Sequence, residues 1–166
     1  MTEGTKSYLF GSHHWLLHPV AIIRAWRAHY GHYPCLWQAV CIFLHDTGIV
    51  GMQYLSGTKD GHWRRGAEIA GWLFGLKGWK LCAGHCIASG WPRSALLFPD
   101  KASWIYQPKW RLALYHLVEG FNDTYTVEEW LASVRERARD GFQEDGHAVF
   151  MREREKKAAQ KGGGNG

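Results

Sequence analysis

The segment "CIFLHDTGIVG", residues Cys41 to Gly51, predicts the end of a buried helix that carries two metal-binding side chains. An apolar run ends on His45 and Asp46, and glycines follow at positions 48 and 51. An aspartate at a helix C-terminus opposes the helix dipole, so a divalent cation would compensate its charge. Adjacent helical residues point about 100° apart. His45 and Asp46 therefore converge on one ion only where the chain unwinds, which the glycines permit.

The stretches on either side of this segment predict an all-α protein. Apolar residues recur at helical spacing, and patterns typical of strands are nearly absent. We expect a compact bundle of about six or seven helices with short connections. The expected helices span residues 18–31, 36–46, 62–75, 79–90, 91–106, 109–120 and 127–155.

Three local features refine these expected helices. Gly66 lies among small residues that allow close helix contact. Pro99 should bend or interrupt its helix just before Asp100, because proline removes a backbone donor. Thr126, with Glu129 three residues later, forms a capping-box pattern and predicts the start of the last helix.

The composition predicts one soluble domain. Hydrophobic residues make up 46% and charged residues 21% of the 166 residues, and no apolar stretch reaches the length of a membrane span. We assign residues 1–150 to a single domain and residues 151–166 to a basic, flexible tail. No secretory signal is visible, so we expect a cytoplasmic protein, or one in the host cytoplasm if it is viral, without a membrane partner.

The four cysteines support the same setting. They form no CxxC pair, and we expect them to be reduced core residues. They are Cys35, Cys41, Cys82 and Cys86.

The net charge of +5 and the ten tryptophans raise the question of nucleic-acid binding. The basic residues are dispersed over several stretches, however, so a small anionic substrate is favoured over a polymer. The abundance of tryptophan also suggests self-association into a homo-oligomer, because aromatic residues are enriched in interfaces.

Further candidate metal ligands lie at the starts of expected helices, within one of them and after the Pro99 break. These are His18, His62, His85 and Asp100. Together with His45 and Asp46 they give the order H...HD...H...H...D. His13 and His14 are alternatives for the first ligand, but His18 is favoured because it directly precedes an apolar helical pattern.

This ordered set resembles the HD-domain superfamily of metal-dependent phosphohydrolases, all-helical proteins defined by a histidine, an HD doublet and a later aspartate. The strings "GHWRRGAEIAGWLFG" and "GHCIASGWPRSALLFPDKAS" strengthen the resemblance, which covers roughly Trp15 to Trp104. The second string is more distantly similar to the HD-GYP branch that cuts cyclic dinucleotides. Compact viral HD proteins that hydrolyse deoxynucleoside triphosphates, including dATP, are similar in size and in the HD...D-K arrangement.

The resemblance implies a first metal on His18, His45, Asp46 and Asp100, and a second on Asp46, His62 and His85. Asp46 would bridge the two ions and be essential for catalysis. Imidazole and carboxylate ligands suit manganese, cobalt, zinc or iron better than calcium, and magnesium is a further candidate. If His62 and His85 merely cap their helices, the enzyme would hold a single ion.

The resemblance also implies that Lys101, beside the last aspartate, faces the phosphate and acts in catalysis. Other candidates for substrate binding flank the proposed ligands or lie in loops, and for each a surface or core role is the alternative. They are Lys59, Arg64, Arg65 and Arg93 for charge, and Trp15 and Trp63 for stacking on a base.

We therefore expect a phosphohydrolase that cleaves a phosphate ester or anhydride of a nucleotide, either a deoxynucleoside triphosphate such as dATP or a monophosphate. One alternative is a phosphodiesterase for a cyclic or short oligonucleotide. The other is a non-catalytic, metal-stabilised module that binds nucleic acid or a protein. A nucleic-acid-binding module would show steeply salt-dependent binding and no phosphate release.

Overall fold

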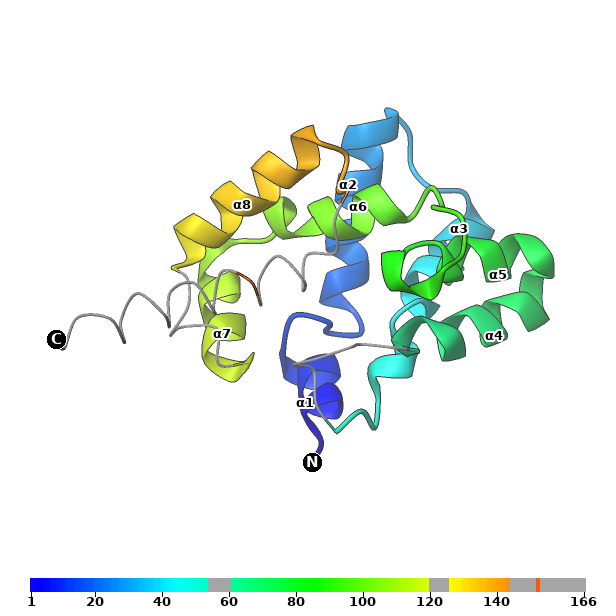
Figure 1. Ribbon diagram of the computed structural model, residues 1–166, viewed down its shortest axis with the longest axis horizontal. Helices are drawn as coiled ribbons and strands as arrows, with labels where there is room; N and C mark the ends of the chain where they lie inside the picture. Colours follow the sequence, from blue (N-terminus) through cyan, green and yellow to red (C-terminus); the bar gives the residue numbers. More distant parts are fainter. Residues whose placement is uncertain (54–60, 120–125, 144–151, 153–166) are drawn as a thin grey trace, which may run out of the picture.

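The computed structural model describes residues 1–53, 61–119, 126–143 and residue 152, and these residues are all helical or irregular (Figure 1). The described part contains no strand, which confirms the predicted all-α class. Its elements are α1 (Glu3–Phe10), α2 (Leu17–Tyr30), α3 (Leu36–Leu44), η1 (Thr47–Ile49), α4 (His62–Phe74), α5 (Leu76–Ala83), η2 (Ile87–Ser89), α6 (Leu97–Ala102), η3 (Ser103–Tyr106), α7 (Lys109–Glu119) and α8 (Val127–Arg139), where η denotes a 3₁₀ helix.

The helices form two groups that meet where α2 packs against α3. In one group, α4 and α5 form an antiparallel hairpin that packs against α3 (Figure 1). In the other, α6 and η3 lie between α2 and α8. α1 contacts η1 in the first group and α7 in the second. The ends of α2, α3, α4 and α6 that carry the candidate ligands therefore face one region.

Two glycines hold the start of α4 against the end of α3. A side chain at Gly66 would meet the backbone of α3, with its Cβ 2.6 Å from the His45 carbonyl oxygen. A Cβ at Gly48, in η1, would collide with the His62 carbonyl. The close helix contact predicted for Gly66 is thus confirmed. Gly48 is needed because it lies directly against the His62 backbone. Gly51 has a different role, since its φ of 91° is in the left-handed region.

The helix expected over residues 91–106 begins later than predicted. α6 starts at Leu97, so Pro99 lies in its first turn, where a helix does not need the missing N–H group. Asp100 donates its backbone N–H to the Leu96 carbonyl at 3.0 Å. The predicted interruption before Asp100 is therefore wrong, because the helix begins before Pro99 and continues through Asp100.

The helix expected over residues 79–90 is also displaced. α5 spans Leu76–Ala83, and His85 follows it in a loop. Gly84 lies against the Pro92 carbonyl, and the Ser94 N–H donates to the Gly84 carbonyl at 3.0 Å. The chain folds back on itself at this point, which ends the helix.

The last helix begins as predicted but ends early. Thr126 and Glu129 form the expected capping box, in which the Glu129 N–H donates to Thr126 Oγ1 at 3.2 Å. α8 ends at Arg139, and Phe142 adopts a positive φ of 52° while its side chain packs in the core. A continuous helix to residue 155 is therefore wrong. The predicted tail lies almost entirely outside the described residues.

α1 was not predicted from the sequence. Thr2 caps it, since the Thr2 hydroxyl accepts the Thr5 N–H at 3.3 Å. An isolated helix of this length is marginal, so the packing against α7 and η1 stabilises it.

The cysteines are all free, as predicted, but one of them is not in the core. Cys41, Cys82 and Cys86 are buried, whereas Cys35 is exposed at the start of α3. None of the described helices is long and apolar enough to cross a membrane.

Candidate metal centre

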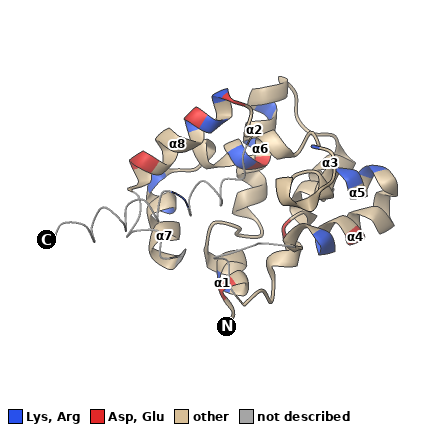
Figure 2. Cartoon of the chain, viewed as in Figure 1, with Lys and Arg blue, Asp and Glu red and all other residues tan. Residues whose placement is uncertain are grey.

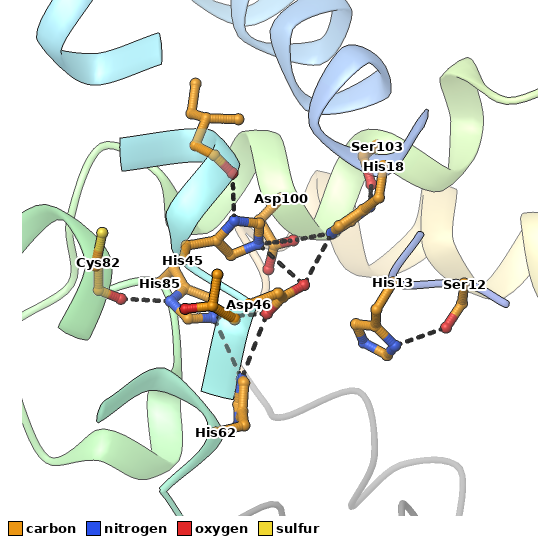
Figure 3. Close-up of polar contacts among 12 residues, drawn as sticks. Ser12, His13, His18, His45, Asp46, His62, Cys82, His85, Asp100 and Ser103 are labelled. Atoms are coloured by element: carbon orange, nitrogen blue, oxygen red, sulfur yellow. Dashed lines mark hydrogen bonds and ion pairs between the residues drawn. The ribbon is translucent and has the colours of Figure 1, made fainter. Parts of the chain in front are cut away.

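Six buried side chains from five segments of the chain converge on one another (Figure 3). The structure brings together every ligand predicted from the sequence. Two groups of potential ligand atoms can be distinguished, and Asp46 belongs to both. We call them site 1 (His18, His45, Asp46 and Asp100) and site 2 (Asp46, His62 and His85).

The packing of α2 against α6 and η3 positions one side of site 1. His18 is the second residue of α2, and its Nε2 lies 3.1 Å from Asp100 Oδ1 in α6. The hydroxyl of Ser103, the first residue of η3, lies 3.4 Å from His18 Nδ1. Both ring nitrogens of His18 are therefore engaged, which fixes the orientation of the imidazole.

The end of α3 positions the other side of site 1. α3 ends at Leu44, and Asp46 has left the helical conformation, with φ −98° and ψ 6°. His45 Nε2 consequently lies 3.1 Å from Asp46 Oδ2. The unwinding predicted for this doublet is confirmed, and it lets adjacent side chains face one point.

Backbone carbonyls orient two of the histidines. His45 Nδ1 donates to the Ile42 carbonyl at 2.6 Å, and His85 Nδ1 donates to the Cys82 carbonyl. Because a carbonyl oxygen only accepts, each Nδ1 carries a proton, and in a neutral ring Nε2 then presents its lone pair. Histidines that bind metals are usually held by such a second hydrogen bond.

Site 2 places two imidazoles, which meet edge-on, beside the shared carboxylate. His62 Nε2 lies 3.2 Å from His85 Nε2. Asp46 Oδ1 lies 3.9 Å from the first of these nitrogens and 3.6 Å from the second. Since His85 Nε2 presents a lone pair, the close approach needs a proton or a cation between the two rings.

The spacing of the ligand atoms fits a first-row divalent ion. Metal–ligand bonds of about 2.1 Å separate neighbouring ligand atoms by about 3.0 Å in octahedral and about 3.4 Å in tetrahedral geometry. In site 1 the nitrogen–oxygen distances lie between 3.1 and 3.6 Å. His45 Nε2 and Asp46 Oδ2 are buried without a hydrogen-bond partner, although they lie close together. Both atoms are therefore available to a common ion.

The carboxylates dominate the electrostatics of site 1. Burial alone would lower the pKa of His45, but Asp46 and Asp100 outweigh it and raise this pKa to about 10. Burial would raise the pKa of Asp46, yet the neighbouring histidines hold it well below its usual range. In site 2, burial lowers the pKa of His85. The two sites thus differ in how strongly protons compete for their ligands.

Lys101 is the best placed of the predicted substrate-binding residues. Its Nζ lies 2.9 Å from Asp100 Oδ2, and its side chain is 29% exposed. Charge from this ammonium also lowers the pKa of Asp100, against the effect of burial. Lys101 therefore stands at the edge of site 1 with access to solvent.

The other predicted substrate-binding residues do not join the ligand groups. Arg64 and Arg65 are exposed on α4, and Arg93 is exposed and donates to the Gln143 carbonyl at 3.0 Å. Trp15 is exposed, whereas Trp63 is buried in the core. Lys59 lies outside the described residues.

The burial of Trp63 favours its alternative role as a core residue. Its ring packs edge-on against Trp79, with centroids 6.2 Å apart. Arg64 lies over the same ring at 5.8 Å. Stacking of Trp63 on a base would require its removal from these contacts.

The turn that follows α1 lies beside site 1, a contact that the sequence did not predict. His13 Nδ1 lies 2.9 Å from the Ser7 hydroxyl and 2.8 Å from the Ser12 hydroxyl. Its ring meets the edge of the His18 ring at a centroid distance of 5.9 Å, so His13 borders site 1 without belonging to it. Burial, and the nearby charge of Asp46, raise the pKa of Tyr8 in α1.

No family model, no curated protein and no solved structure matches this chain.

Proposed function

We propose that the protein is a metal-dependent phosphohydrolase that cleaves a phosphate ester or anhydride of a nucleotide. The observation that carries the proposal is that Asp46 is shared by two adjacent groups of buried ligands. The resemblance of these residues to the HD-domain superfamily supports the same conclusion. When bound at such sites, divalent ions supply an activated water and positive charge for the phosphoryl oxygens.

The residues of the chain provide placement and charge, which are the main demands of phosphoryl transfer. The hydrogen bonds from Nδ1 of His45 and of His85 to backbone carbonyls hold both rings in fixed orientations. Lys101 places an ammonium beside Asp100, where it would bind a phosphate oxygen. Burial excludes bulk water and strengthens each of these interactions.

A mononucleotide is the favoured substrate, either a deoxynucleoside triphosphate such as dATP or a monophosphate. Lysines and arginines are dispersed over several helices and alternate with acidic residues on α8 (Figure 2). A protein that tracks a long polyanion usually carries a continuous basic stripe. The distribution of charge therefore favours a small anionic ligand.

Product analysis tests this function directly. The purified protein is loaded with manganese, cobalt, zinc or magnesium and incubated with deoxynucleotides, ribonucleotides, monophosphates and cyclic dinucleotides, with Asp46→Asn as the control. Release of phosphate, pyrophosphate or triphosphate from a mononucleotide supports the proposal and names the bond that is cut. A linear dinucleotide as the product would assign the protein to phosphodiesterases instead. The absence of turnover with every metal would contradict the proposal and favour a binding module.

A further inference from the structure

A second buried polar cluster lies at the N-terminal end of α7. Gln107 and Arg111 are each only 7% exposed. Within the described residues, both amide atoms of Gln107 and Nη2 of Arg111 lack a hydrogen-bond partner. No described carboxylate forms an ion pair with Arg111, and its guanidinium instead lies over the Tyr115 ring at 5.0 Å.

This arrangement is costly unless an anion completes it. A buried guanidinium without a counterion loses its hydration, and an aromatic ring restores little of it. Arg111 also lies in the first turn of α7, where the helix dipole is positive and disfavours a cation. Burial lowers the pKa of Arg111, and the neighbouring Tyr115 side chain opposes this effect only in part. The guanidinium and the helix end therefore add to one positive field.

The direction of helical side chains places both groups of donors at the same end of α7. Side chains in an α-helix tilt toward its N-terminus, so Arg111 extends toward the end of α7 that Gln107 precedes. The Gln107 amide supplies two further donors and one acceptor. Helix N-termini are established binding positions for phosphate groups. The cluster thus has the composition of a site for a phosphate group.

The cluster is connected to site 1 on two sides. Gln107 directly follows η3, whose first residue, Ser103, contacts His18. On the other side, α7 packs against α1, and His14 lies in the turn that follows α1. The His14 carbonyl accepts the backbone N–H of His18 at 3.0 Å. The segments that hold His18 therefore also border the cluster.

We propose that Gln107 and Arg111 bind a phosphate group, and that this group belongs to the nucleotide whose other end occupies the metal centre. Phosphate binding follows from the cluster itself. Its assignment to the substrate rests on the phosphohydrolase function proposed above. In this arrangement the Arg111 guanidinium and the Gln107 NH₂ donate to phosphate oxygens.

Thermal melts of the full-length, manganese-loaded protein, titrated with inorganic phosphate at constant ionic strength, test the binding. Arg111→Met should weaken the apparent phosphate affinity about tenfold, the usual loss for a charge-assisted hydrogen bond. Gln107→Leu should weaken it less, and Arg24→Met, an exposed arginine on α2, should leave it unchanged. Equal phosphate affinity in the wild type and Arg111→Met would overturn the proposal.

The same melts separate an anion site from a purely structural arginine. Without phosphate, Arg111→Met should melt at a higher temperature than the wild type, because it removes an uncompensated buried charge. An arginine that only stabilises the fold would give a lower melting temperature in every buffer, and that result would also overturn the proposal.

Kinetics identify the source of the phosphate. For a nucleoside triphosphate substrate, Arg111→Met should raise KM about tenfold with kcat nearly unchanged, and Arg111→Lys should recover part of the loss. Weakened phosphate binding with an unchanged KM would assign the cluster to free phosphate and overturn the substrate assignment. If the wild type hydrolyses nothing, the phosphohydrolase proposal fails, and the melts still decide whether the cluster binds phosphate.

Discussion

The two halves of the metal centre are built from different chemistry. Site 1 contains two carboxylates and two imidazoles, whereas site 2 contains two imidazoles and shares its one carboxylate with site 1. Three of the four ligands of site 1 lie on packed helices or at their ends. In site 2, His62 begins α4 and His85 lies in the loop after α5. Site 1 is therefore the more anionic position, and we expect it to bind an ion more strongly than site 2, which depends on Asp46 and on the placement of α4.

The largest expected effect comes from the residue that the two sites share. Asp46→Asn should remove both ions and reduce turnover more than about a hundredfold. Loss of a residue that only supports a metal ligand already lowers metal affinity or activity by about 10–100-fold. Metal content measured by mass spectrometry, together with phosphate release, checks this expectation. Retention of both ions in Asp46→Asn would show that the two sites are independent.

A ligand of site 2 alone should separate the sites. His62→Asn should leave one ion per chain and reduce turnover, since site 1 keeps its four ligands. His32→Asn, an exposed histidine outside both sites, is the matched control. Loss of both ions in His62→Asn would contradict the division into a strong and a weak site.

Proton competition should also distinguish the sites. The pKa of His45 is raised to about 10, so at neutral pH a proton must leave before site 1 binds its ion. The pKa of His85 is lowered, so its ring is already neutral. Between about pH 6 and pH 8, affinity at site 1 should rise at least about tenfold per pH unit, because the pKa of His18 is raised as well, and it should rise more steeply than affinity at site 2. Titration calorimetry at several pH values tests this, and equal slopes would contradict it.

The smallest expected effect concerns how α4 is placed. Gly66→Ala would press a methyl group against the His45 carbonyl and should destabilise the fold by about 1–3 kcal/mol. Gly71→Ala is the matched control in the same helix, because its Cβ would meet only the Trp79 side chain at 3.3 Å or more. Denaturant unfolding compares the two. Similar stability in both variants would show that close packing at Gly66 does not position His62.

The sequence predicted the ligands better than the elements that carry them. The order of histidines and aspartates resembles that of the HD-domain superfamily, and this resemblance pointed to all six residues that the structure brings together. Helix boundaries depended on tertiary contacts that no local pattern contains. Gly84 ends α5 because the chain folds back onto it, and Phe142 turns away from α8 to pack in the core.

Other residues escaped sequence reasoning because their meaning depends on their surroundings. In the sequence, Arg111 is indistinguishable from any solvent-exposed arginine on a helix. Only the structure shows that it is buried without a counterion. His13 was considered as a ligand, but hydroxyl groups of Ser7 and Ser12 hold it beside His18 instead. The capping residue Thr2 and the acidic Glu3 in the first turn were the local signals for α1.

The central claim is that Asp46 joins two neighbouring ion sites. Electron paramagnetic resonance of the manganese-loaded protein tests it most directly. We expect two ions per chain with the spectrum of an exchange-coupled pair, and an uncoupled single-ion spectrum in His62→Asn. Uncoupled manganese in the wild type, or no bound manganese at all, would contradict the shared role of Asp46.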